Sequence, residues 1–389
     1  MSKTSVVKHS RFGTAVVVAA TALVLAACTS QAPTSTSAPT GAPPTVAATP
    51  TPTATPTASA VADPTIRVPL QCANLFTPAS AGALLNVPVT AAIDETTEPT
   101  DLEDAANLQR GILTCTWGGK DRTDGGYDQA LSLYVDPDGA TDFPANLPWF
   151  SAHIMDHPTK NAFGDQSVSG CMAGGGLQCF ADVLVGGYWV TVDLHDLDSS
   201  HKVTKATATS RLQQIMKVVV PALQSAVAPG APWVAPTAAK NGFCDKKNNV
   251  VDVRKALASP GLDYDSDPAD TGSEVTYLAD LDGPLFSCSW YQSGSTPKGQ
   301  SSSATVDLLQ GGAWVIPQFV ADPPTQWYVG QYKVISVDGT TGAVLACNSA
   351  DCQAIVGIGA NAAAISFDDL GSKRNLANVT AMVKAIAAT

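Results

Sequence analysis

The sequence has little charge and no excess of basic residues. Only 14% of its 389 residues are charged, and 22 Lys and Arg stand against 34 Asp and Glu, which gives a formal net charge of −12. Proteins bind nucleic acids and anionic lipid surfaces through clustered positive charge. The composition therefore excludes a nucleic-acid partner and a polybasic contact with lipid headgroups.

Sequence motifs of hydrolases and metal enzymes are also lacking. There is no G-x-S-x-G, and the S-x-x-K matches at Ser199–Lys202 and Ser295–Lys298 have no S-D-N or K-T-G partner. No C-x-x-C is present, which argues against a zinc site built from thiolates. The Ala173–Gly176 segment (AGGG) lies between two cysteines, so we interpret it as a hairpin tip and not as a phosphate cradle. We expect no catalytic residue, no cofactor and no bound metal ion.

The N-terminus has the features of an export signal. Basic residues precede an apolar run from Gly13 to Ala27, and this run is shorter than the roughly 20 residues that a membrane-spanning helix needs. Ala26 and Ala27 stand directly before Cys28, which resembles the lipobox of bacterial lipoproteins. The resemblance implies that residues 1–27 are a signal peptide and that Cys28 carries acyl chains such as palmitate. The alternative is an ordinary cleaved signal, with Cys28 incidental.

The segment after Cys28 is rich in Pro, Thr and Ser and has almost no charge. Without apolar periodicity it cannot form a core, and its prolines favour extended polyproline II structure. We interpret residues 28–65 as a tether, in which about 36 residues at ~3.1 Å each reach at most about 110 Å. The composition also permits O-glycosylation.

The cysteines indicate an internal duplication. Lipidation of Cys28 leaves eight of the nine, in two sets of four: Cys72, Cys115, Cys171 and Cys179, then Cys244, Cys288, Cys347 and Cys352. Corresponding members are 172, 173, 176 and 173 residues apart, and a Cys-x-Trp motif occurs at Cys115–Trp117 and again at Cys288–Trp290. Such near-constant spacing is typical of two copies of one domain.

Four cysteines in each half of an exported chain predict two disulfides per half, for which three connectivities exist. The last two cysteines of each set flank a turn whose length differs between the copies, which suits a clasped hairpin. We therefore predict the pairs Cys171–Cys179, Cys347–Cys352, Cys72–Cys115 and Cys244–Cys288, with no free thiol in the mature fold.

The same order of elements is expected in both copies. Helices are predicted over residues 76–85 and 248–257, with Thr77 as N-cap and Pro78 as first residue of the former, and over 208–223 and 376–388. Alternating strands are predicted over 130–137, 304–311 and 332–339, and strands over 188–194 and 363–370 are expected to close the two sheets. The fold class is α+β: two tandem homologous domains, each a mostly antiparallel sheet with helices on one face. The domains are residues 66–228 and 243–389, joined by a proline-rich linker, 229–242.

The segment from Cys72 (CANLFTPASAGALLNVPV), with the later Cys-Thr-Trp strand, resembles uncharacterised surface lipoproteins of actinobacteria. Their folded domain begins with a Cys-x-x-Leu-(Leu/Phe)-Thr helix, matched here by Cys72, Leu75, Phe76 and Thr77. The second copy keeps Cys244 and Leu257 but not the Leu-Thr signature. The resemblance implies a surface lipoprotein and brings no catalytic residue with it.

Several residues are candidates for chemistry, each with a plainer interpretation. His153 and His157 are spaced as metal ligands on a helix, but Ile154 stands where a zincin has its Glu base, so an exposed helix face is preferred. The Asp263–Glu274 loop has acids at the spacing of an EF-hand, but Pro268 replaces its required Gly, so we prefer a solvated acidic loop to calcium binding. The other candidates are His195 and His201. Five aromatic residues could form a ligand-binding surface, but we prefer to interpret them as core or interdomain packing: Trp149, Phe150, Trp314, Trp327 and Tyr328.

We expect a non-enzymatic protein, anchored by lipid on Cys28 to the outer face of the cell membrane, that binds a ligand or an envelope protein. The junction between the two domains is the expected binding surface, with Trp149 and Trp314 at equivalent positions near it. The alternative is a metal-dependent or hydrolytic surface enzyme that uses the histidines of the first domain.

Overall fold

The computed structural model describes residues 63–89, 99–118, 129–143, 159–160, 162–173, 177–196, 203–235, 242–244, 250–265, 284–326 and 329–389. They belong to one compact unit of the chain, residues 60–389. The proposed signal peptide, Cys28 and all but the last three residues of the proposed tether lie outside the described residues. In the described part of the chain, no helix is long and apolar enough to span a bilayer.

The first sheet has six antiparallel strands in the order β1-β2-β6-β5-β4-β3. Because side chains alternate across a strand, Val190 and Val192 of β6 face the core while Thr191 between them faces the other side. The strands are β1 Leu113–Gly118, β2 Gln129–Asp136, β3 Thr159–Lys160, β4 Gln166–Ala173, β5 Leu177–Val185 and β6 Tyr188–Asp196.

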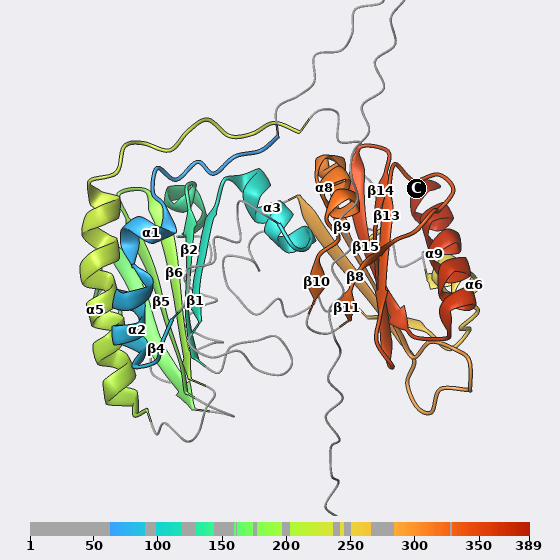
Figure 1. Cartoon of the computed structure of the whole chain (residues 1–389), viewed down its shortest axis with the longest axis horizontal. Coiled ribbons are helices and arrows are strands. Elements are labelled where there is room, and N and C mark those ends of the chain that lie inside the picture. The colour runs from blue at the N-terminus through green and yellow to red at the C-terminus, as the bar shows by residue number, and fades with distance from the viewer. Residues whose placement is uncertain are drawn as a thin grey trace, which may run out of the picture. The chain divides into compact units, whose positions relative to one another are not determined.

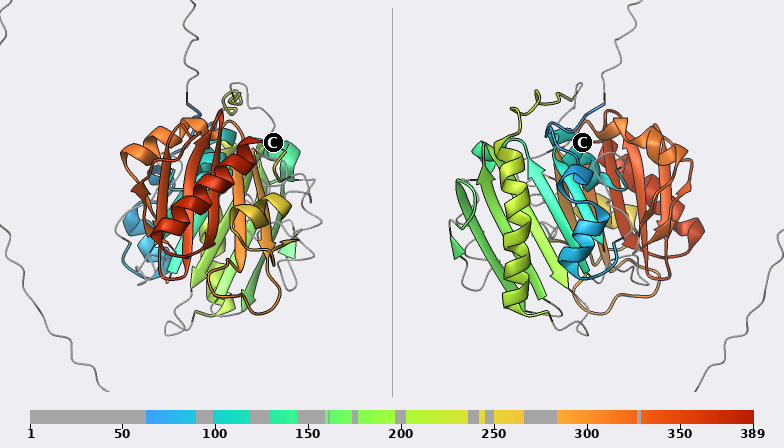
Figure 2. Two further views of the ribbon diagram at one scale, coloured as in Figure 1. Left: turned by 90° about the vertical axis from the view of Figure 1, so that its right-hand side faces the viewer. Right: turned by 60° about the vertical axis from the view of Figure 1, so that its left-hand side comes forward.

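Helices α1 (Cys72–Leu75), α2 (Pro78–Leu85) and α5 (Lys205–Gln224) cover the core side of the first sheet, as Figures 1 and 2 show. Thr77 is the N-cap of α2, and its hydroxyl accepts a hydrogen bond from Ser80 N at 3.2 Å. The buried Trp117 indole donates to Phe76 O at 3.1 Å and thereby fixes α1 and α2 to β1. The predicted start of α2 and its cap are confirmed.

The second sheet has seven antiparallel strands in the order β12-β13-β14-β15-β9-β8-β7. Its strands are β7 Asp263–Asp265, β8 Leu285–Tyr291, β9 Ser303–Leu309, β12 Lys333–Val334, β13 Ala343–Cys347, β14 Asp351–Ile358 and β15 Asn361–Asp368. A separate two-stranded pair joins β10 (Thr325–Gln326) to β11 (Gly330–Gln331). Helices α6 (Val250–Ala256) and α9 (Ser372–Ala387) pack on one face, which is also visible in Figure 1.

The two sheets have the same strand order once the edge strand β7 is left aside. Reading across each sheet, β1, β2, β6, β5, β4 and β3 take the places of β8, β9, β15, β14, β13 and β12. The register agrees as well, because Cys171 is paired with Cys179 and Cys347 with Cys352 across the corresponding hairpins. The fold class is therefore α+β with antiparallel sheets.

The strands that come last in each half lie inside their sheets. We expected them to close the sheets, but β6 runs between β2 and β5, and β15 runs between β9 and β14. Each of these strands forms a hairpin with the strand before it and then pairs with a strand from early in the same half. The short strand β12 takes the edge instead.

Helix α3 (Leu102–Arg110) was missed, and it changes the expected layering. Its apolar residues Leu102, Ala105 and Ala106 pack against the second sheet, although α3 directly precedes β1 of the first sheet in sequence. The 3₁₀-helix η2 (Gly312–Trp314) and α8 (Ile316–Ala321) join it in the same apolar cluster. The second sheet thus has helices on both faces, so the expectation of helices on one face alone is incomplete.

The disulfides are Cys72–Cys115, Cys171–Cys179, Cys244–Cys288 and Cys347–Cys352. These are the four pairs that the spacing predicts. The two longer bridges join a segment near the start of each half to the Cys-x-Trp strand, β1 or β8, and the two short ones are hairpin clasps.

Candidate functional site

The residues proposed from sequence are only partly placed. His153, His157, His201, Trp149, Phe150, Trp327 and Tyr328 lie outside the described residues, as do Ser199–Lys202, Gly174–Gly176 and most of the acidic loop after Asp265. His195 lies on β6 and Trp314 in η2. Asp263 is at the start of β7, where Arg254 forms an ion pair with its carboxylate, so this first acid of the loop is used within the fold.

A cavity of about 300 Å³ lies where the first half, the linker and the second half meet. We call it the junction cavity. It is lined by Arg67, Gln109, Arg110 and Asp138 from the first half, Pro232, Trp233 and Ala235 from the linker, and Pro284 and Gln310 from the second half. Five of these nine side chains are polar or charged, so the cavity is suited to a polar ligand.

Arg67 fixes the linker to the wall of the junction cavity. Its guanidinium makes a two-pronged ion pair with Asp138, at 2.6 and 3.0 Å, and its Nε donates to Gly230 O at 2.8 Å. The backbone of Gly230 donates back to Arg67 O at 3.2 Å. The Arg67 side chain is buried while that of Asp138 is 44% exposed, and the bidentate geometry leaves Arg67 little freedom to move.

Arg110, the last residue of α3, holds two more carboxylates. Its Nη2 donates to Asp136 at 2.8 Å and to Asp142 at 2.5 Å. Asp136 is fully buried, and this burial raises its pKa to about 6, although the charge of Arg110 opposes the shift. The cluster has two arginines and three aspartates, so it offers no net positive charge to an anion.

Glutamines connect the cavity to α3 and η2. In the orientation that satisfies both neighbours, the Gln109 amide donates to Gln310 O at 3.2 Å and accepts from Trp314 Nε1 at 3.0 Å. Trp314 therefore packs between α3 and the second sheet, as the plainer interpretation has it. Two buried donors on cavity-lining residues, Arg110 Nη1 and Gln310 Nε2, have no hydrogen-bond partner in the described structure.

A second polar group lies on the first sheet, on the face away from α5. Asp182 of β5 is 1% exposed and accepts from Thr191 at 2.7 Å and from Trp189 Nε1 at 3.1 Å. Burial raises its pKa to about 7, and the nearby charge of Asp193 adds to the shift. Asp193 accepts from Gln178 at 3.2 Å and lies 3.9 Å from His195 Nδ1. His195 is thus beside a carboxylate.

This polar group does not form a three-ligand metal site. Among the described residues, one set of three His, Cys, Asp or Glu ligand atoms lies within 4.8 Å of one another, and it consists of Cys347, Cys352 and Asp369 in the second half. His195, Asp193 and Asp182 are not close enough together to meet that criterion.

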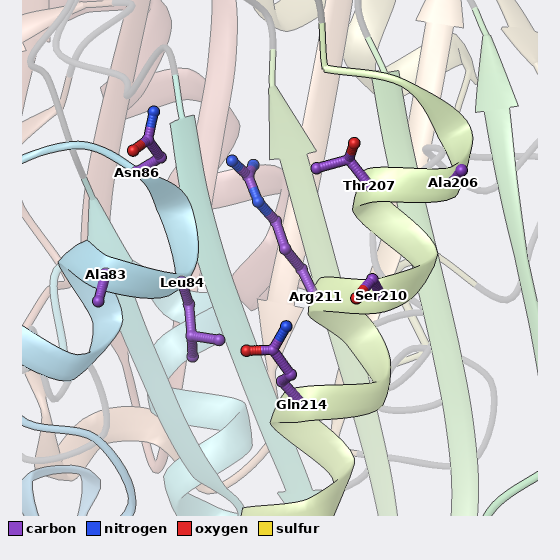
Figure 3. Close-up of a pocket in the computed structure, with 8 residues that line it drawn as sticks. All are labelled: Ala83, Leu84, Asn86, Ala206, Thr207, Ser210, Arg211 and Gln214. Atoms are coloured by element: carbon purple, nitrogen blue, oxygen red, sulfur yellow. The ribbon is translucent and has the colours of Figure 1, made fainter.

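A groove of about 470 Å³ lies between α2 and α5 on the outer side of the first half. Figure 3 shows Leu84 and Asn86 of the α2 side facing Arg211 and Gln214 of α5 across it. The Arg211 guanidinium extends along the groove toward Asn86. No buried polar group of this groove lacks a partner within the described structure, which distinguishes it from the junction cavity.

Sequence reasoning missed the residues of the junction cavity. Arg67, Arg110 and Asp138 have no motif, and 43 and 28 residues of chain separate them in order. The one available signal was the group of aspartates in and after β2, because a chain with only 14% charged residues concentrates Asp136, Asp138 and Asp142 there. Their arginine partners come from other segments and could not be assigned.

Comparison with known proteins gives no family. No family model matches the sequence, and no curated protein matches it. Among solved structures, the crystal structure of the di-domain ARO/CYC StfQ from the steffimycin biosynthetic pathway aligns with 83% of this chain and 95% of its own, at 8% identity and a TM-score of 0.15. A TM-score this low supports no inference about fold or function.

Proposed function

We propose that the protein is a non-enzymatic, lipid-anchored protein of the cell surface that binds a ligand between its two halves. The export signal, Cys28 and the tether support the anchored location, and the four disulfides suit an oxidising compartment. A Cys28→Ser variant should be released into the medium or remain as an unprocessed precursor. Acyl-chain labelling that persists in this variant would contradict the anchor.

The two halves are proposed to be tandem copies of one domain, residues 66–228 and 243–389, joined by the linker 229–242. The shared strand order and the matching cysteine spacing support this origin. Among the described residues the two halves differ, because α3 and α8 pack on the outer face of the second sheet. The first half, the linker and the second half contribute different residues to the junction cavity, so neither half could form it alone.

The observation that carries the binding function is the pair of unpartnered donors at the junction cavity. A buried donor without a partner costs about 1–3 kcal/mol. Arg110 Nη1 and Gln310 Nε2 are buried donors of residues that line the cavity, and we propose that small side-chain movements on binding bring them to acceptors of the ligand. The balance of two arginines and three aspartates disfavours an anion. A neutral ligand with carbonyl or hydroxyl oxygens, stacked against Trp233, fits this wall best.

Native mass spectrometry of protein purified from its own envelope tests this function. We expect a co-purifying neutral molecule that is lost from a Gln310→Leu variant. A Gln318→Leu variant, altered at an exposed position of α8, is the matched control and should retain the molecule. If the wild-type protein carries nothing and both variants behave alike, the junction cavity is not a ligand site.

A hydrolytic enzyme is the second candidate, because Asp193 lies beside His195 and its charge also acts on the buried Asp182 of the same sheet face. A carboxyl group with a pKa of about 7 is suited to proton transfer near neutral pH. Turnover of ester, glycoside or peptide substrates, abolished by Asp182→Asn without a change in circular dichroism, would favour this candidate. Absence of turnover across these substrate classes would leave the binding function.

A further inference from the structure

The clasp of the second half brings three potential metal ligands together. Cys347 of β13 and Cys352 of β14 are register partners joined by a disulfide, and Asp369 follows directly after β15. The two sulfur atoms and a carboxylate oxygen of Asp369 lie within 4.8 Å of one another. Cys347 is exposed, whereas Cys352 is fully buried.

Asn375 of α9 is hydrogen-bonded to all three of these residues. Its Nδ2 donates to Asp369 Oδ1 at 2.6 Å and to the sulfurs of Cys352 and Cys347 at 3.1 and 3.4 Å. Its own Oδ1 accepts from Leu370 N at 3.0 Å, so the direction of the amide is fixed. Asn375 is 1% exposed, and this network holds Asp369 against the clasp.

We propose that reduction of the Cys347–Cys352 disulfide creates a zinc site with three protein ligands, the two thiolates and the Asp369 carboxylate. The C-x₄-C spacing of the cysteines falls within the range of structural zinc sites. The Asn375 amide takes the place of the outer hydrogen-bond donors that orient ligands in such sites. Water completes the tetrahedral coordination. The site is independent of the junction cavity.

Two hydrogen bonds hold the Asp369 carboxylate in place beside the clasp. Asn375 Nδ2 donates to Asp369 Oδ1 at 2.6 Å, and Gly371 N donates to the same oxygen at 2.8 Å. The carboxylate is therefore oriented by neighbouring groups, as the ligands of metal sites commonly are.

In the oxidising compartment proposed for this protein the clasp is a disulfide, so the redox step requires an external thiol reductant of the dithiol class. One thiolate of the dithiol attacks Sγ of Cys347, the exposed residue of the pair, forms a mixed disulfide and expels the Cys352 thiolate. The second thiol of the reductant resolves the mixed disulfide, so the reductant leaves oxidised and the clasp has gained two electrons and two protons. Zinc binding then releases the thiol protons to water.

Exposure selects this disulfide among the four. Of the eight cysteines that the structure describes, Cys347 is the exposed one, Cys244 is half-buried and the rest are buried. The other clasp, Cys171–Cys179, occupies the same register in the first sheet but is at most 4% exposed. It also has the longer C-x₇-C spacing, so it serves as the internal control.

The experiment is limited reduction of the full chain with dithiothreitol, followed by titration with Co²⁺ and Zn²⁺. We expect one metal per chain by native mass spectrometry and a thiolate-to-cobalt charge-transfer band in the near ultraviolet. The Asn375→Ala variant should bind about 10- to 100-fold more weakly, as loss of outer-sphere partners does. The Cys171→Ser/Cys179→Ser variant should bind as the wild type does, and Cys347→Ser/Cys352→Ser should not bind.

A second variant removes the need for reductant. Cys347→His leaves Cys352 as a free thiol and supplies an imidazole at the exposed position, so it should bind one Zn²⁺ without reduction, and adding Asp369→Asn should abolish this. Absence of metal from both the reduced wild type and Cys347→His overturns the proposal. Binding that survives Cys347→Ser/Cys352→Ser overturns it as well.

Discussion

Trp189 and Asp182 lie on the outer face of the first sheet, and Ala362 and Ile355 hold the corresponding positions in the second. In the second sheet, small side chains leave room for α3 and η2 to pack directly on β15. In the first, the same positions carry a large indole and a buried carboxyl group. One strand plan thus supports two different surfaces, which among the described residues differ in side-chain volume and polarity at these positions.

Helix α3 contacts both halves of the structure. Helix α3 belongs to the first half by sequence, yet its apolar side packs on the second sheet, while Arg110 at its end pairs with Asp136 and Asp142 of the first. Gly111, with φ of 78°, ends the helix, and a Cβ there would lie 2.3 Å from the Arg67 side chain. The turn at Gly111 therefore lies between α3, which packs on the second sheet, and Arg67, which lines the junction cavity.

Replacing Trp189 by Ala should have the largest effect on the first face. Trp189 is fully buried, stacks edge-on with Phe143 and donates to Asp182. Its loss should lower the free energy of unfolding by about 3–5 kcal/mol, since a large cavity is left. Urea denaturation measures this. Trp189→Phe, which keeps most of the side-chain volume, is the control. If both variants lose equal stability, the loss comes from the hydrogen bond to Asp182 and not from the cavity.

The buried carboxyl groups predict that stability falls as pH rises. Burial raises the pKa of Asp182 to about 7 and those of Asp136 and Asp307 to about 6, above the unfolded value of 3.8. The folded state therefore holds more protons between pH 4 and 7, so stability is full below about pH 4 and is lost as the pH passes the folded pKa values.

Asp182→Asn should remove most of the pH dependence of stability that arises from the outer face of the first sheet. The loss for Asp182 is on the order of 4 kcal/mol between pH 4 and 8, and the variant should show a flatter profile and higher stability at pH 8. Thermal unfolding across this pH range checks it. Asp307→Asn is the counterpart on the second sheet, where Ser287 donates to the carboxyl group at 2.7 Å. A profile unchanged by either substitution contradicts the assignment.

Ala362→Leu tests the second face by overpacking. Ala362 is fully buried in the cluster that contains Leu102, Ala105 and Ala106 of α3. Added methylene groups should cost about 1–3 kcal/mol and should displace α3, which limited proteolysis near residue 100 would detect. Protection of α3 equal to that of the wild type would mean that the interface can adapt to a larger side chain.

Local features of this fold were accessible from the sequence. The capped start of α2 at Thr77 and Pro78, the terminal helices and the alternating strands β2 and β9 each depend on neighbouring residues, so periodicity and capping rules sufficed. The strand predicted over 332–339 was mostly wrong, because it is reduced to β12, Lys333–Val334. The disulfides were accessible because the cysteine spacing recurs in both halves and restricts the possible pairs. Proposals on anchoring and ligand binding remain predictions.

Non-local features were not accessible. Helix α3 has only three apolar contact residues, and nothing in its sequence specifies that they pack on the sheet of the other half. The pairing of Arg67 with Asp138, 71 residues apart, follows from how the segments fold together. Such contacts arise from tertiary packing, which a single sequence does not encode in any local pattern.

The smallest expected effect concerns the N-termini of the two terminal helices. Thr204 caps α5, and its hydroxyl accepts from Thr207 N at 3.2 Å, whereas α9 begins after Gly371, which makes no side-chain cap. Thr204→Ala should therefore cost about 1 kcal/mol. A capping Ser cannot simply be added to the second half, because Gly371 has φ of 93° and a side chain there is strained. We expect Gly371→Ser to destabilise the protein, by about 1 kcal/mol or more, and equilibrium unfolding of both variants in urea measures the comparison. If Gly371→Ser is instead more stable, the backbone at residue 371 can relax to a capping conformation. The N-terminus of α9 could then adopt the same cap geometry as that of α5, and the two halves would differ there only in sequence.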